Sequence, residues 1–306
     1  ERCRREKEKN REGNKKKVEK AFEKKRTDKH KKMIVKNKKK KKRKRKKNGY
    51  NRKIERKEVK ESIKKAKNGT ASGDDKVANE VIKKGGEALI DMLYEICDRC
   101  FEEEMVPEDW LRCVLFPLHK DGDKRDPYNY RCIALLSVVS KIYETVINER
   151  VMKYLEKWKK ISEEQGGFRR RRGTIDQIMV LHSILEERKS KEIYCCYIDM
   201  RKAYDRVWRV GLWTRLREAG IQGKIWSVIR GMYKKTMCKI RLGKEETEEF
   251  ERFTGVRQGG ILSPMLFSIF MDEVVERLNE LDIGVEWGGG KKVVCLLYAD
   301  DIVIIT

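Results

Sequence analysis

No stretch of this sequence is apolar for long enough to cross a membrane, and histidine is almost absent. The apolar runs all fall well short of the roughly 20 residues that a membrane-spanning helix needs, so we expect no membrane partner. The three histidines, His30, His119 and His182, are far apart in a chain of 306 residues. A zinc site of the usual histidine–cysteine kind is therefore not indicated.

The cysteines also lack a pairing pattern. There are nine, an odd number, and no secretory segment is visible, so we expect a reducing compartment inside the cell: the nucleus, the cytoplasm or both. Cys97 and Cys100 form a CxxC pair with no second pair or histidine to complete a zinc site. Because they lie in an apolar helical pattern, we expect buried helix cysteines there.

Positive charge is concentrated near the N-terminal end. Residues 1–60 hold 32 Lys and Arg against 9 Asp and Glu, which accounts for nearly all of the net charge of +25. Such a segment repels itself, so we expect residues 1–56 to form a basic arm that is disordered or helical. The arm can bind a polyanion through counterion release, and a nuclear-targeting signal or a solvated linker helix fits the same composition. The candidate nucleic-acid contacts in it are Lys39, Lys40, Arg43 and Arg45.

The rest of the sequence mixes helical and strand patterns and predicts an α+β fold. Helices are expected over residues 59–67, 77–105, 138–155, 178–185, 207–219 and 224–232, with another beginning at Ser263 as N-cap and Pro264. Strands are expected over 114–118, 239–242 and 250–254, the last two paired. The continuous apolar run 193–198 predicts a buried strand.

The most informative pattern lies at the end of the chain. Two apolar, β-branched runs, 293–298 and 302–306, flank Ala299-Asp300-Asp301 and predict a hairpin with an acidic turn. Adjacent carboxylates raise each other's pKa unless a cation relieves them, and hard oxygen ligands favour Mg²⁺. A solvated Asp-Asp turn is the alternative. A second pair, Asp74-Asp75, lies in a polar stretch without strands and predicts only a loop.

A third carboxylate, Asp199, ends the strand predicted over 193–198. If that strand lies beside the hairpin, Asp199, Asp300 and Asp301 can converge on one point. Three carboxylates can hold two Mg²⁺ ions roughly 3.5–4 Å apart, the arrangement used for in-line phosphoryl displacement. One ion would lower the pKa of an attacking hydroxyl, and the other would neutralise the leaving phosphates. Many α/β proteins also end a strand with Asp, so spacing alone leaves this open.

A glycine-rich passage, residues 255–264, lies between the acidic strands. Its glycines let the backbone approach a ligand closely, and the helix that follows offers free N–H groups. Gln258 can hydrogen-bond a sugar or a base edge. A glycine-rich turn needed only for packing is the alternative.

Basic residues suit the same chemistry. Lys120 and Arg131 flank a highly charged hairpin loop, and residues 169–172 are all arginine. Guanidinium and ammonium groups bind triphosphates and template backbones. For any one of them, solvated surface is the simpler interpretation.

Taken in order, these motifs resemble one family, the reverse transcriptases of non-LTR (LINE-like) retrotransposons, from about Val59 to Thr306. Telomerase and group II intron enzymes are more distant relatives. The matching segments are Lys64–Asp75, Pro107–Trp110, Phe116–Lys120, Asn129–Arg131, Lys141-Ile142, Gln165–Arg169, Thr174–Gln177, Tyr197–Asp205, Gly255–Phe267 and Tyr298–Asp301.

The resemblance implies a right-hand polymerase fold with fingers over residues 57–180 and a palm over 181–306. The sequence stops just after the acidic hairpin, so we expect an incomplete palm, a missing thumb and weak processive synthesis. An upstream endonuclease, which many relatives carry, is also expected to be missing. The basic arm resembles the charged linker that follows that domain.

The resemblance also implies roles for single residues. Asp199, Asp300 and Asp301 would be the catalytic metal ligands for two Mg²⁺ ions, with Mn²⁺ a possible substitute. Tyr204 would stack under the sugar and exclude a ribose 2′-hydroxyl. The remaining implied contacts are to the incoming dNTP, by Lys120, Arg131, Gln258 and Gly259, and to nucleic acid, by Arg169 and Arg170. Lys202 and Asp205 would have local support roles. The implied partners are an RNA template, a DNA primer or target and dNTP; no protein partner is indicated.

The sequence departs from the family pattern at several positions. Cys132 stands where relatives usually carry Pro or Gly, Arg171 where Gly is common, and Gly260-Ile261 follow Gln258-Gly259 in place of the usual Cys-Pro. No metal ligand is lost, and the departures suggest an old, drifting element copy. The rival hypotheses are a catalytically inactive remnant that binds nucleic acid through its basic arm and, less favoured, a telomerase- or intron-type enzyme.

Overall fold

The computed structural model describes residues 49–188, 192–281, 283–287 and 290–306. Residue contacts divide the chain into two units, Glu1–Arg52 and Lys53–Thr306. In the first unit, the described residues form the short helix η1 (Gly49–Asn51). The arm residues expected to contact nucleic acid, namely Lys39, Lys40, Arg43 and Arg45, lie outside the described residues. We call the second unit, residues 53–306, the body.

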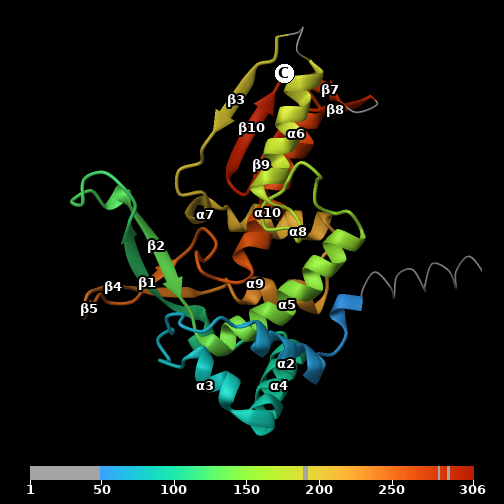
Figure 1. Cartoon of the computed structure of the whole chain (residues 1–306). Coiled ribbons are helices and arrows are strands. Elements are labelled where there is room, and N and C mark those ends of the chain that lie inside the picture. Colours follow the sequence, from blue (N-terminus) through green and yellow to red (C-terminus); the bar gives the residue numbers. More distant parts are fainter. Residues whose placement is uncertain (1–48, 189–191, 282, 288–289) are drawn as a thin grey trace, which may run out of the picture. The chain divides into compact units, whose positions relative to one another are not determined.

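A group of helices forms one end of the body (Figure 1). It consists of α2 (Arg56–Lys65), α3 (Asn79–Lys84), α4 (Gly86–Glu102) and part of α5 (Val138–Lys157). Arg150 of α5 forms a largely buried ion pair with Glu58 of α2 (2.6 Å). Cys97 and Cys100 are buried in α4, as the helical pattern predicted.

The larger sheet has the strand order β2-β1-β4-β5, with β6 also paired to β4. Its strands are β1 (Arg112–His119), β2 (Tyr130–Leu135), β4 (Thr236–Leu242), β5 (Glu245–Glu246) and β6 (Phe250–Arg252). The short helices η2 (Glu108–Leu111) and η3 (Pro127–Asn129) precede β1 and β2. β1 and β2 form the charged hairpin, β1 runs parallel to β4, and the predicted pairing of β4 with β6 is confirmed.

The smaller sheet has the order β3-β10-β9, and neighbouring strands are antiparallel. Its strands are β3 (Cys195–Ile198), β9 (Cys295–Tyr298) and β10 (Asp301–Ile305). Helix α6 (Thr174–Glu187) lies along one face of this sheet, where Ile184 packs with Leu296, Val303 and Ile305 (Figure 1). The hairpin of β7 (Val285–Trp287) and β8 (Lys291–Val293) adjoins this cluster.

Four further helices connect strands of the two sheets along the chain. The helices α7 (Ala203–Arg206), α8 (Arg209–Glu218) and α9 (Lys224–Gly231) follow β3, and α10 (Ser263–Asn279) follows β6. The predicted start of α10 is one residue off, because Leu262 is the N-cap and Ser263 is the first helical residue. The Ser263 hydroxyl pairs instead with the hydroxyl of Tyr233 (3.2 Å).

The prediction of a buried strand over 193–198 is wrong. Within the described residues β3 pairs only with β10, so it forms an edge of the smaller sheet, and Tyr197 is 72% exposed. A continuous apolar run fits an edge strand as well as a central one, because burial depends on strand order.

The α+β prediction is confirmed by these elements. In the part of the chain that the structure describes, no helix combines the length and the apolar character that a membrane crossing requires.

Candidate active site

The acidic turn between β9 and β10 is tight. Asp301 pairs with Tyr298 in the ladder, so only Ala299 and Asp300 form the turn, and Ala299 has a φ of +61°. A left-handed alanine carries strain, which must be held by its surroundings. Asp300 therefore lies in the turn itself, whereas Asp301 is already the first residue of β10.

Gln165 holds this turn in place. Its side-chain oxygen accepts hydrogen bonds from the N–H groups of Ala299 (3.1 Å) and Gly167 (2.8 Å), and its amide nitrogen donates to the Ala299 carbonyl (3.4 Å). Gly167 must be glycine, because a Cβ there would stand 2.3 Å from the Ala299 nitrogen. The segment beginning at Gln165 thus supports the strained turn from outside the sheet.

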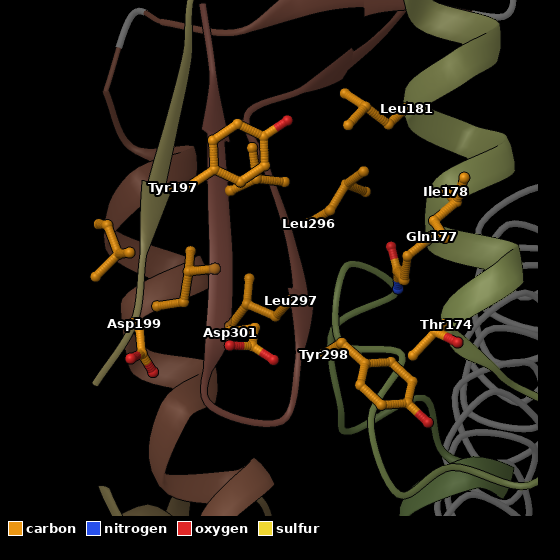
Figure 2. A pocket seen from close by; sticks show the side chains of 13 residues that line it. Thr174, Gln177, Ile178, Leu181, Tyr197, Asp199, Leu296, Leu297, Tyr298 and Asp301 are labelled. Atoms are coloured by element: carbon orange, nitrogen blue, oxygen red, sulfur yellow. The ribbon is translucent and has the colours of Figure 1, made fainter. Parts of the chain in front are cut away.

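Asp199 stands beside Asp301. Ile198 at the end of β3 pairs with Ile302 of β10, so the next position brings Asp199 next to Asp301 across the antiparallel ladder. Both side chains line a cavity of about 400 Å³ between α6 and the smaller sheet, at the same end of their strands (Figure 2). Apart from these two carboxylates the cavity is largely apolar, with Tyr197 and Tyr298 on its sheet side.

Asp300 lies differently. It does not line that cavity; its charge acts on Tyr204 instead. Burial, together with the negative charge of Asp300, raises the pKa of the Tyr204 hydroxyl, and the positive charge of Arg131 opposes this shift. Asp300 and Asp301 therefore act on different parts of the site.

No described residue forms an ion pair with Asp199, Asp300 or Asp301 or donates a hydrogen bond to their carboxylates. Within the described ranges, no three His, Cys, Asp or Glu side chains gather closely enough to hold a metal ion. Joint binding of metal ions by Asp199, Asp300 and Asp301 therefore stays a prediction. The pair Asp199 and Asp301 still fits Mg²⁺, which commonly takes one or two protein carboxylates together with water and substrate phosphates.

Tyr204 links the acidic strands to the glycine-rich passage. Its ring stacks on Phe267 of α10 at 4.9 Å with an interplanar angle of 10°, and it meets the edge of Phe168 at 6.4 Å. Its carbonyl accepts a hydrogen bond from Val256 N–H (2.8 Å). At Gly255, with φ +77°, a Cβ would stand 2.7 Å from the Tyr204 carbonyl, so only glycine allows this approach.

The same passage presses on β2. The Gln258 carbonyl accepts from the Ala134 N–H at 2.6 Å, and Gly259 has a φ of +114°. A Cβ on Gly259 would stand 2.6 Å from the Ala134 carbonyl. Gln258 and Gly259 are therefore fixed against the strand that carries Arg131 at its other end.

The basic hairpin presents Lys120 and Arg131 to solvent. Both are exposed, and neither forms an ion pair with an acidic side chain of the described residues. The Lys202 ammonium lies 5.0 Å from the Tyr128 ring centroid, so the loop that follows Asp199 meets the hairpin tip. The local support role expected of Lys202 stays a prediction.

Arg169 does not fit the nucleic-acid contact expected of it. Its side chain is only 5% exposed, pairs with Glu156 (3.0 Å) and donates to the carbonyls of Ser162 and Gln165. It holds the loop ahead of α6 together and leaves no surface for a phosphate. Arg170 is 62% exposed but pairs with Glu149, so its role stays a prediction.

Sequence reasoning missed two sets of residues. Gln165 lies in a recognised motif, but nothing local indicates that it reaches Ala299, 134 positions away. Glu144 and Arg257 form a fully buried ion pair beneath the glycine-rich passage. A signal for Glu144 was available: it is a single acid in the mostly apolar part of α5 between Ile142 and Ile147.

Carboxylates at the ends of neighbouring strands, beside a glycine-rich loop and a basic hairpin, form the kind of site that can handle phosphate groups through divalent ions. The chain belongs to the reverse transcriptase (RNA-dependent DNA polymerase) family, whose model matches residues 119–306.

Several proteins that the chain resembles come from mobile elements. The chain is 28% identical to a probable RNA-directed DNA polymerase from transposon X-element of Drosophila melanogaster, over 71% of this chain and 24% of that protein. It is 27% identical to the corresponding protein of transposon BS and 26% identical to that of mobile element jockey of the same species, in each case over 81% of this chain and 27% of the relative. The chain thus spans about a quarter of the length of the curated relatives that it matches.

These matches confirm the predicted resemblance to LINE-like reverse transcriptases. A solved structure of apo telomerase from Candida tropicalis is similar at 15% identity with a TM-score of 0.47, covering 71% of this chain and 49% of that one. That likeness is too slight to define the fold.

Proposed function

We propose that this chain forms the catalytic core of an RNA-directed DNA polymerase of a LINE-like retrotransposon. One observation carries the proposal beyond family membership. Asp199 and Asp301 lie side by side on neighbouring strands, open to one cavity, and no described residue neutralises them. Exposed like charges at this spacing are unfavourable by themselves and favour a divalent cation.

Asp199 and Asp301, together with Asp300 in the turn, would hold the metal ions, Mg²⁺ or as a substitute Mn²⁺. Such ions, when bound, lower the pKa of an attacking primer 3′-hydroxyl and neutralise the leaving pyrophosphate. The paired strands hold Asp199 and Asp301 in place, and the hydrogen bonds of Gln165 hold the turn. The spacing of the carboxylates is therefore set before the substrate binds.

The other site residues would position dNTP. Lys120 and Arg131, which are exposed and have no acidic partner among the described residues, would bind the triphosphate. The Tyr204 ring, held flat on Phe267, would support the sugar and exclude a ribose 2′-hydroxyl. The fixed backbone at Gln258 and Gly259 would contact the incoming nucleotide.

In the fold as a whole, residues 57–180 would act as fingers and 181–306 as palm, with RNA template and DNA primer between them. Arg170 and the basic arm over residues 1–56 would contact nucleic acid by charge. Synthesis of DNA on an RNA template would take place in the nucleus, the cytoplasm or both, and we expect the protein there.

The test is primer extension on an RNA template with dNTP and Mg²⁺, comparing the wild type with Asp300→Asn. Glu61→Gln, which changes an exposed carboxylate on α2, is the control. We expect incorporation by the wild type and the control and its loss in Asp300→Asn. Equal incorporation by all three would remove the acidic turn from the mechanism. Salt-sensitive RNA binding without any incorporation by the wild type would support the inactive remnant instead.

A further inference from the structure

A buried ion pair lies directly beneath the loop from Gly255 to Leu262. Arg257 donates to Glu144 of α5 at 2.7 Å, and both side chains are 0% exposed. The second arm of the same guanidinium donates to the carbonyl of Trp110 (2.9 Å). The loop is thereby tied to two elements that precede it by more than a hundred residues.

Glu144 also holds the other end of the loop. Its second oxygen accepts from the N–H groups of Ile261 (2.7 Å) and Leu262 (3.2 Å), where α10 begins. The first N–H groups of a helix have no partner within the helix, and a negative charge there is favourable. One carboxylate therefore fixes the loop at Arg257 and at Ile261, on both sides of Gln258 and Gly259.

Tyr233 provides a second brace. The Arg257 guanidinium lies 4.9 Å from the centre of its ring, and that of Arg209 lies 5.3 Å from it. Arg209 is buried and donates to the carbonyls of Gly255 and Tyr233, both at 2.9 Å. Burial lowers the pKa of Arg209 to about 10, which keeps the side chain charged at neutral pH.

Gln258, which is half-buried, and Gly259, which is exposed, lie between these two anchored ends of the loop, with their backbone against Ala134 of β2. Burying a charge pair costs desolvation free energy that a well-packed apolar pair would avoid. The network is therefore a costly way to gain stability. What it provides in addition is a fixed direction for each hydrogen bond, and so a single conformation for the loop.

We propose that Glu144 and Arg257 are positioning residues, which set the conformation in which Gln258 and Gly259 meet the incoming nucleotide. This inference rests on the proposed polymerase function. Neither side chain touches the substrate, because both are sealed beneath the loop.

The experiment compares Glu144→Gln with a matched control, Glu58→Gln. Glu58 of α2 forms a second well-buried ion pair with α5, through Arg150 (2.6 Å; side chains of Glu58 and Arg150 15% and 4% exposed), and this pair joins α5 to α2 instead of to the loop. Both variants weaken a buried ion pair that involves α5. Only Glu144→Gln should raise the KM for dNTP, by about tenfold or more, the scale of one lost hydrogen bond to a charged group. In steady-state incorporation, kcat should change less than KM.

Hydrogen exchange in the full chain gives a readout that needs no catalysis. The amides of Ile261 and Leu262 should exchange about tenfold faster in Glu144→Gln than in Glu58→Gln when both are compared at equal global stability. Arg257→Lys, which keeps the charge and loses the forked geometry, should show the same changes to a smaller extent. It replaces Glu144→Gln if that variant does not fold.

The outcomes separate the two proposals. If the wild type incorporates no nucleotide, the polymerase function fails, and the exchange comparison still decides whether Glu144 fixes the loop. If Glu144→Gln and Glu58→Gln have equal effects on KM and on exchange, the pair stabilises the fold in general and the inference is overturned.

Discussion

Asp199 and Asp301, at the same end of β3 and β10, are exposed, and no described residue donates to them; we call this pair the acidic edge. Beneath the glycine-rich loop, Glu144 and Arg257 are fully buried, and Glu144 uses both of its oxygens. The contrast shows two uses of charge. A carboxylate that is to bind a ligand must be left without a protein partner, whereas a carboxylate that holds backbone in place must be satisfied by the protein. The unpaired carboxylates lower the stability of the fold, whereas the effect of the buried carboxylate depends on the geometry of its hydrogen bonds.

The largest expected effect tests the acidic edge. Asp199→Asn should lower incorporation by at least about 100-fold, as removal of one preorganised electrostatic group does. The same variant should keep or slightly raise the melting temperature without divalent ions, because it removes one of two neighbouring negative charges. Primer extension and thermal unfolding measure both. A clear fall in melting temperature would show that Asp199 has a protein partner and would break the contrast.

The buried pair should behave in the opposite way. Arg257→Met leaves Glu144 buried without its cation and should cost about 3–5 kcal/mol of unfolding free energy. Adding Glu144→Leu should recover part of this loss, since an apolar pair avoids the buried charge, but the amides of Ile261 and Leu262 would still lack an acceptor. Urea unfolding measures each variant. A double variant that loses the sum of the two single losses would show that the two side chains do not act as a pair.

Gln165 belongs to neither class, because it is neutral and buried, yet it supports the acidic turn. Gln165→Leu should cost about 1–3 kcal/mol, as Ala299 and Gly167 lose buried partners. Incorporation should fall as well, because the turn carries Asp300. Activity equal to the wild type in Gln165→Leu would mean that the sheet alone holds the turn.

The smallest expected effect concerns the loop backbone. Gly259→Ala should destabilise the protein by about 1–2 kcal/mol more than Gly243→Ala, since both glycines have positive φ but only Gly259 meets another backbone. Denaturant unfolding measures the difference. Equal losses in the two variants would show that the loop can move away from Ala134.

Elements with a local signature could be predicted from the sequence. The helices α4, α5 and α9 and the β9–β10 hairpin follow from apolar periodicity and turn chemistry, which depend on residues close together in the chain. The adjacency of Asp199 to the hairpin could be anticipated only as a possibility, because strand order is a property of the whole fold.

What could not be predicted depends on distant contacts or on single turns of the backbone. The edge position of β3 follows from the strand order, and the burial of Arg169 follows from a fold of the loop around Glu156. The division between Asp300 and Asp301 depends on a two-residue turn, since the hairpin pattern does not say which of two adjacent residues begins the strand. Lys120 and Arg131 are exposed, so their charge and the family resemblance were the available signals, and their role stays a prediction.

The central claim is that the acidic edge is kept unpaired for divalent cations. Titration of the full chain with Mn²⁺, followed by electron paramagnetic resonance of the free ion, tests this without nucleic acid or catalysis. The account predicts saturable Mn²⁺ binding by the wild type and by Glu61→Gln and its loss in the double variant Asp199→Asn/Asp301→Asn. Binding of Mn²⁺ by the double variant at the level of the wild type would contradict it.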